Sequence, residues 1–174
     1  GRVYVSAYMN DRIQIFDLEG KLIKTIPISK PTHVSVHQKT GDIYVFSYLI
    51  LEFGWDRDKQ PDMEASMVHL GDFDNPIVKS KCPLPLTGYF NKAIFNFDAN
   101  FQHVIELDSW ADKPTIWISN GKNGALTPNH AHTYFDLQMN ANGGGAQLFE
   151  EIEGKLVLKT SFYEKTKKQV ERIK

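Results

Sequence analysis

The sequence opens with Gly1-Arg-Val-Tyr-Val-Ser-Ala-Tyr8, and this stretch returns without a gap, forty residues later, as Gly41-Asp-Ile-Tyr-Val-Phe-Ser-Tyr48. Four of the eight positions are identical, and Val3 is matched by Ile43. Both copies are rich in aromatic and β-branched residues, which favour β-strands. The repeat therefore predicts a strand at the same place in two successive structural units.

Three more strand-like segments lie between the two copies. Arg12–Phe16 alternates polar and apolar residues after the turn signal Asn10-Asp11. Lys21–Ile26 follows a turn that closes on Gly20, and Pro31–Val36 comes last. Four short strands in about forty residues predict that residues 1–40 form one four-stranded antiparallel meander.

A second internal match lies near the end of the sequence. Glu153-Gly-Lys-Leu-Val157 matches Glu19-Gly-Lys-Leu-Ile23 at an offset of 134 residues. This offset is not a multiple of forty, so insertions are expected to interrupt the repeat. The polar, loop-like stretches at about 54–65 and 121–145 are the predicted insertions.

The repeat resembles a known family. Residues 4–22 and 34–45 resemble the NHL repeat of β-propellers, whose pattern is a strand, a turn and then Asn-x-Arg-Ile-x-Val-Phe-Asp-x-x-Gly-Lys. The resemblance is clearest over residues 1–48. It implies an all-β fold in which residues 1–174 form a single β-propeller segment of four-stranded antiparallel blades. The alternative is an antiparallel β-sandwich, but the gapless repeat favours the propeller.

The number of blades bears on the expected partner. At forty residues a blade, 174 residues make about four blades, whereas NHL-like propellers usually close with six. The resemblance thus implies an incomplete ring with open sheet edges. Because open edges promote aggregation, we expect the remainder of the propeller, or another protein chain, to be the partner.

The composition excludes several classes of function. The sequence holds 20 Lys and Arg against 21 Asp and Glu, a formal net charge of −1, which argues against a nucleic-acid-binding protein. No stretch approaches 18 consecutive apolar residues, so no transmembrane helix is expected, and the balanced charge does not suggest a membrane-surface binder. Cys82 is the only cysteine, which rules out an internal disulfide and a cysteine-rich zinc site.

Histidines are the candidate metal ligands. His130 and His132, in Pro128-Asn-His-Ala-His132, point to the same side of an extended segment and can reach one ion. Imidazole suits Zn, Cu, Fe or Ni, and the third ligand would come from another blade. His33 is the best candidate, because the resemblance implies that its strand lines the central channel. His69 and His103 rank lower, since their segments read as outer strands. The alternative is that these histidines are solvated or hydrogen-bonded and bind no metal.

Two functions from different classes follow. The first is a scaffold that binds a partner or a small-molecule ligand and needs no catalytic residue. The second, which the resemblance implies, is a metal-dependent lyase or hydrolase with one divalent transition metal held in the channel by histidines. No catalytic residue can be assigned, and the cellular compartment stays open.

Overall fold

The computed structural model describes residues 1–48, 64–85, 101–122 and 146–161. Within these ranges the chain forms β-strands and one short 3-10 turn, η1 (Tyr8–Asn10), and no α-helix. The prediction of an all-β fold is confirmed. In the same ranges, no helical segment has the length and hydropathy that are needed to cross a membrane.

The strands form three antiparallel sheets in which neighbours in sequence are neighbours in space. The N-terminal sheet contains β1 (Val3–Ala7), β2 (Arg12–Phe16) and β3 (Leu22–Pro27). The middle sheet contains β4 (Pro31–Val36), β5 (Ile43–Ser47), β6 (Ser66–Leu70) and β7 (Val78–Pro83). The C-terminal sheet contains β8 (Phe101–Asp108), β9 (Thr115–Lys122), β10 (Ala146–Ile152) and β11 (Lys155–Ser161).

The first predicted meander has a different boundary from the one expected. Pro31–Val36 does not close a sheet with the preceding strands but pairs as β4 with β5. The chain leaves the N-terminal sheet at Lys30, which has a φ of 44°. Asp11 holds this turn, because its Oδ1 accepts from the Lys30 amide at 2.9 Å and its Oδ2 accepts from Lys30 Nζ at 3.1 Å. The four-stranded units therefore run from β4 to β7 and from β8 to β11.

The two matched Gly-Lys-Leu segments lie in equivalent hairpin turns. Gly20 stands between β2 and β3 with a φ of 84°, and Gly154 stands between β10 and β11 with a φ of 73°. Glycine suits both positions because a positive φ costs it little. The second turn has only two residues between Ile152 and Lys155, and Glu153 also has a positive φ, 49°, as a type I′ hairpin requires.

The predicted insertions are only partly within the described residues. β9 continues through Gly121 and Lys122, whose backbones pair with β8. Strand pairing thus extends two residues into the stretch of about 121–145 that the sequence predicts as an insertion. Residues 54–63 and 123–145 lie outside the described residues.

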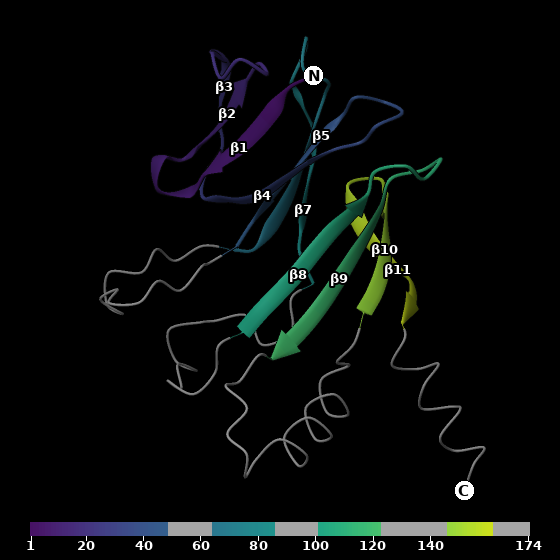
Figure 1. Cartoon of the computed structure of the whole chain (residues 1–174). Coiled ribbons are helices and arrows are strands. Elements are labelled where there is room, and N and C mark those ends of the chain that lie inside the picture. The colour runs from purple at the N-terminus through teal and green to yellow at the C-terminus, as the bar shows by residue number, and fades with distance from the viewer. Residues whose placement is uncertain (49–63, 86–100, 123–145, 162–174) are drawn as a thin grey trace, which may run out of the picture.

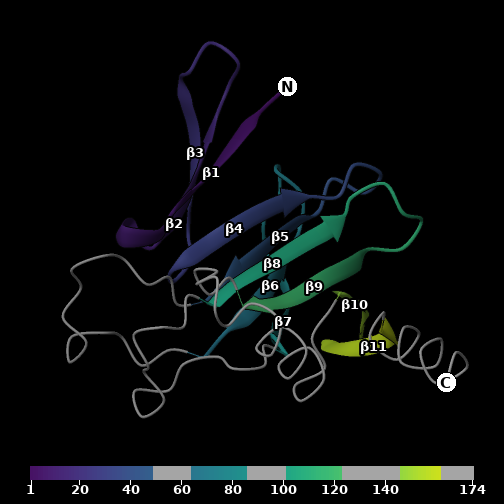
Figure 2. The same cartoon turned by 60° about the horizontal axis from the view of Figure 1, so that its bottom comes forward.

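The three sheets pack face to face, with the middle sheet covered on both sides (Figures 1 and 2). Strand β5 shows this directly, since successive side chains of a strand point to opposite faces. Ile43 and Val45 enter the core shared with the N-terminal sheet, whereas Tyr44 and Phe46 enter the core shared with the C-terminal sheet. Every residue of β5 is consequently buried.

The first strands of the two complete units, β4 and β8, lie side by side and run in the same direction (Figure 2). The loops that follow them are tied together. The Gln38 amide donates to the Ser109 carbonyl at 2.8 Å, and Lys39 Nζ lies 2.6 Å from Asp112 Oδ1. These contacts fix one end of the middle sheet against the C-terminal sheet.

Candidate functional site

His33 lies on β4, where the middle and C-terminal sheets meet. A bulge between Pro31 and His33 places His33 opposite Phe46, and the two rings stack with centroids 5.8 Å apart. His33 Nε2 lies 2.9 Å from Ser35 Oγ and 3.8 Å from Glu106 Oε2 on β8. The side chains of His33 and Glu106 are 36 % and 63 % exposed, so a ligand can reach both.

Tyr48, directly after β5, lies beside this site. Its backbone is fixed at the start of β4, because Thr32 Oγ1 donates to the Tyr48 carbonyl at 2.8 Å and accepts from the Tyr48 amide at 3.2 Å. Burial and, to a smaller extent, the charge of Glu106 raise the pKa of Tyr48 above its usual value. The imidazole of His33 and the carboxylate of Glu106 thus lie near each other, and Tyr48 is held next to Thr32 at the same end of β4. We call His33 and Glu106, with Tyr48 beside them, the first-strand site.

The predicted metal ligands are brought together only in part. His33 stands on the first strand of its sheet, with Glu106 as its carboxylate neighbour. His130 and His132 lie outside the described residues, so their approach to His33 stays a prediction. Within the described residues, no three His, Cys, Asp or Glu side chains are grouped so that they could hold a metal ion.

A second polar cluster lies deeper between the same two sheets. Strand register places Tyr44, His69 and Ser80 in one row across β5, β6 and β7. The ring of His69 stacks on Tyr44, with centroids 4.3 Å apart and an angle of 17° between the rings. Glu151 of β10 meets this row from the C-terminal sheet and accepts a hydrogen bond from the Ser80 hydroxyl.

Both ring nitrogens of His69 face carboxylates. Nε2 lies 2.9 Å from Asp42 Oδ2, and Nδ1 lies 2.9 Å from Glu151 Oε2. Ionised carboxylates only accept hydrogen bonds, so both nitrogens donate and the ring is a charged imidazolium. Burial alone would lower the pKa of His69, but the hydrogen bonds to Glu151 and Asp42 outweigh burial and raise it.

Lys79 completes this cluster, which we call the His69 network: Asp42, His69, Lys79, Ser80 and Glu151. Lys79 Nζ lies 2.8 Å from both carboxylate oxygens of Asp42. Burial works to raise the pKa of Asp42 and of Glu151, but their hydrogen bonds prevail and lower both values. The positive charges of His69 and Lys79 equal the negative charges of Asp42 and Glu151, so the network has no net charge. The side chains of His69, Asp42 and Glu151 are at least 85 % buried. The network joins the two sheets.

Sequence reasoning missed the His69 network. Its members are spread from residue 42 to residue 151, and nothing in the local pattern around any of them marks a common site. His69 itself lies on β6, the third strand of its sheet, and both of its ring nitrogens are engaged. His103 lies on β8, the first strand of the C-terminal sheet. Because β8 is an edge strand of this sheet, the expectation that its segment is the outer strand of a propeller blade stays a prediction.

His37 is a buried structural histidine. Its Nε2 donates to the Ala111 carbonyl at 3.0 Å, and its Nδ1 lies 3.0 Å from Thr40 Oγ1 and accepts from the Thr40 amide at 3.3 Å. Both ring nitrogens are thus engaged, Nε2 as a donor and Nδ1 as an acceptor. His37 ties the loop after β4 to the loop after β8.

Comparison with known proteins does not assign this chain to a family. No protein-family model matches this sequence, and no relative was found among curated proteins. The resemblance to the NHL repeat therefore rests on the residues of this sequence alone.

Proposed function

We propose that this chain is a segment of an NHL-like β-propeller that acts as a binding scaffold, with its ligand or partner bound at the first-strand site. One observation carries the proposal. Four-stranded antiparallel meanders follow one another along the chain, pack face to face, and place their first strands side by side. A propeller repeats such units radially, with one strand of each blade nearest the axis.

The chemistry of the first-strand site supports binding. Glu106 offers an exposed carboxylate, while His33 can donate or accept a hydrogen bond. The ring of Phe46, fully buried in the core, stacks on the His33 ring and holds it in place. The arrangement suits a polar ligand, or a partner side chain, that carries hydrogen-bond donors or a positive charge.

The second candidate function is a metal-dependent lyase or hydrolase. The pairing of His33 with Glu106 favours it, because imidazole and carboxylate are both common ligands of divalent transition metals. His130 and His132 would complete the ligand set. A metal there would polarise the substrate or activate a water molecule.

Native mass spectrometry separates the two functions. The chain is isolated from its natural source without chelator and compared with the variants His33→Ala and Glu106→Gln. Glu19→Gln, in the exposed turn between β2 and β3, is the matched control. The scaffold proposal expects a bound organic molecule or polypeptide that both site variants lose and the control keeps.

A different mass change supports the metal-dependent function. The expected signal is one transition-metal ion per chain, lost in His33→Ala and also when His130 and His132 are replaced by Ala. If no added mass is found, or if the added mass survives all of these substitutions, the first-strand site is not the binding site.

A further inference from the structure

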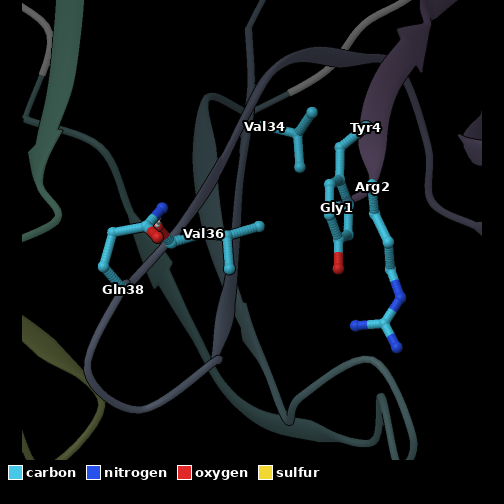
Figure 3. Close-up of a pocket in the computed structure, with 6 residues that line it drawn as sticks. All are labelled: Gly1, Arg2, Tyr4, Val34, Val36 and Gln38. Carbon is cyan, nitrogen blue, oxygen red and sulfur yellow. Dashed lines mark hydrogen bonds between the residues drawn. The ribbon is translucent and has the colours of Figure 1, made fainter. Parts of the chain in front are cut away.

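The middle sheet meets its two neighbours through different chemistry. Toward the N-terminal sheet, the ring of Tyr4 faces two valines of β4 across a cavity of about 690 Å³ (Figure 3). Two cations from the N-terminal part of the chain lie over the Phe73 ring, with Arg2 Cζ 3.7 Å and Lys24 Nζ 4.4 Å from its centroid. Neither contact includes a histidine, the residue whose charge changes near neutral pH. Toward the C-terminal sheet, by contrast, the middle sheet presents the His69 network.

Within the His69 network, the pairing of His69 with Glu151 crosses from one sheet to the other. Asp42 and Lys79, on the side of the middle sheet, hold each other, because both carboxylate oxygens of Asp42 lie 2.8 Å from Lys79 Nζ. Glu151 comes from the C-terminal sheet and contacts His69 Nδ1 at 2.9 Å and the Ser80 hydroxyl. Its side chain is only 13 % exposed. In the described part of the chain, His69 is thus the cation that pairs with this buried carboxylate.

Loss of a proton from His69 would weaken this contact between the sheets. A neutral imidazole has one N–H, so it can donate to Asp42 or to Glu151 but not to both. The network would then change from neutral to a net charge of −1 in a largely buried place, which is costly. Asp42 would keep the positive charge of Lys79, whereas Glu151 would keep only the neutral Ser80 hydroxyl. The cost therefore falls on the contact that joins the two sheets.

The titratable side chains around His69 come from both sheets: Asp42, Tyr44, Lys79 and Cys82 from the middle sheet and Glu151 from the C-terminal sheet. The pKa of His69 is raised above 6.5, whereas the pKa values of Asp42 and Glu151 are lowered from 3.8 and 4.5. Burial raises the pKa of Tyr44 above 10.0 and the pKa of Cys82 above 9.0. A change between about pH 6.5 and 9 therefore points to His69.

We infer that the His69 network is a pH-sensitive switch between the middle and C-terminal sheets, which stay in contact at this place while His69 is charged and part locally when His69 loses a proton. The inference goes beyond the proposed function, because it concerns a movement between two sheets and requires no ligand. Local opening of this kind leaves the rest of a fold in place. It is therefore distinct from unfolding of the whole chain.

The switch and the first-strand site are linked through β5 and through the C-terminal sheet. The ring of Tyr44 stacks on His69, and two residues later the ring of Phe46 stacks on the histidine of the first-strand site. Both rings lie in the core shared with the C-terminal sheet. Because β8 and β10 belong to one hydrogen-bonded sheet, opening at the switch should also move Glu106 relative to His33. This consequence rests on the proposed function, whereas the switch itself does not.

Cys82 is a natural reporter of this opening. It is the only cysteine of the chain, and it is fully buried in the core that the two sheets share. Alkylation of the full 174-residue chain by iodoacetamide is followed by mass spectrometry from about pH 6 to 9. Each rate is divided by the rate for a synthetic peptide of residues 79–85 at the same pH, which removes the titration of the free thiol. We expect the normalised rate to rise by about tenfold or more over this range.

Two comparisons show whether the opening is local and whether it depends on His69. Alkylation through local opening should respond little to low concentrations of urea, whereas alkylation through global unfolding would accelerate steeply. In His69→Gln the normalised rate should be high throughout and should rise by less than about twofold, since Gln does not titrate. Ser47→Ala, which removes a hydrogen bond to the Ser29 carbonyl, is the matched control and should keep the pH dependence of the unmodified chain. The pH and urea series use the unmodified chain, so they do not depend on how His69→Gln folds.

Three results would overturn the inference. The first is a normalised alkylation rate that does not change with pH, and the second is a rise that depends on urea as global unfolding does. The third is the same rise in His69→Gln, because another group would then control the opening. None of these results involves a ligand of the first-strand site. A failure of the switch is thus distinguishable from a failure of the proposed function, which the mass of a bound ligand tests.

Discussion

Replacing His69 with Gln tests the reasoning about the His69 network. The substitution keeps a polar side chain of similar length but removes the positive charge between Asp42 and Glu151. Asp42 retains Lys79, and Glu151 retains the Ser80 hydroxyl. The network then changes from neutral to a net charge of −1 in a largely buried place.

The magnitude follows from the two contacts that are lost. A hydrogen bond to a charged group contributes about 1.5–3 kcal/mol to stability. Removing one partner of a buried ion pair is also costly, because it leaves a charge without compensation. Since Gln can replace part of one hydrogen bond, we expect His69→Gln to lower the free energy of unfolding by about 2–4 kcal/mol near pH 6. For a chain of this size that is a fall in Tm of roughly 5–15 °C.

The loss of stability caused by His69→Gln should depend on pH. The pKa of His69 in the folded chain is raised above its ordinary value of 6.5. Its stabilisation is therefore fully present below about pH 6.5 and is lost as the pH rises through the folded value. The pKa values of Asp42 and Glu151 are lowered from 3.8 and 4.5. Their stabilisation is present above those values and is lost as the pH falls through the lowered ones. The network stabilises most between about pH 5 and 6.5.

Thermal unfolding followed by circular dichroism, from pH 5 to pH 9 at constant ionic strength, measures the effect. The difference in Tm between the unmodified chain and His69→Gln should be largest near pH 6 and should fall by at least about half at pH 9. Ser47→Ala is the matched control. The buried Ser47 hydroxyl donates to the Ser29 carbonyl at 2.9 Å, and neither group titrates in this range, so the loss of stability in Ser47→Ala should not vary between pH 6 and pH 9. A penalty for His69→Gln that is the same at pH 6 and pH 9 would refute the charged-network interpretation.

Three further predictions concern the fold. Gly71→Ala should destabilise the chain by about 2–4 kcal/mol in chemical denaturation, since the new Cβ would lie 2.1 Å from the Asn75 carbonyl oxygen. Gly20→Ala, with a φ of 84° and open space around it, should cost only about 1 kcal/mol; an equal cost at both glycines would contradict the steric argument. Lys39→Ala removes an exposed ion pair with Asp112 and should change the free energy of unfolding by less than about 1 kcal/mol. A larger loss in chemical denaturation would show that this ion pair is not a weak surface contact. Phe46→Ala empties a fully buried position between two sheets and should cost about 3–5 kcal/mol, so a loss below about 1 kcal/mol would count against the packing described here.

The sequence by itself determined the strands and much of their spacing. The alternation in Arg12–Phe16 and the aromatic, β-branched residues of the repeat predict strands because they encode side-chain orientation along a single segment. Gly20 marks a turn for an equally local reason, its tolerance of a positive φ. The all-β class could be predicted from such local signals.

Only the tertiary structure decided which strands pair and which side chains meet. The residue pattern of Pro31–Val36 predicts a strand, but which sheet this strand joins depends on the turn that Lys30 and Asp11 form. The contact between these two residues spans 19 positions of the sequence. The His69 network depends on Glu151 of another sheet, which packing of two separate meanders brings to His69. Local sequence carries the preferences of one segment, whereas sheet order and buried ion pairs arise from contacts between segments far apart in the chain.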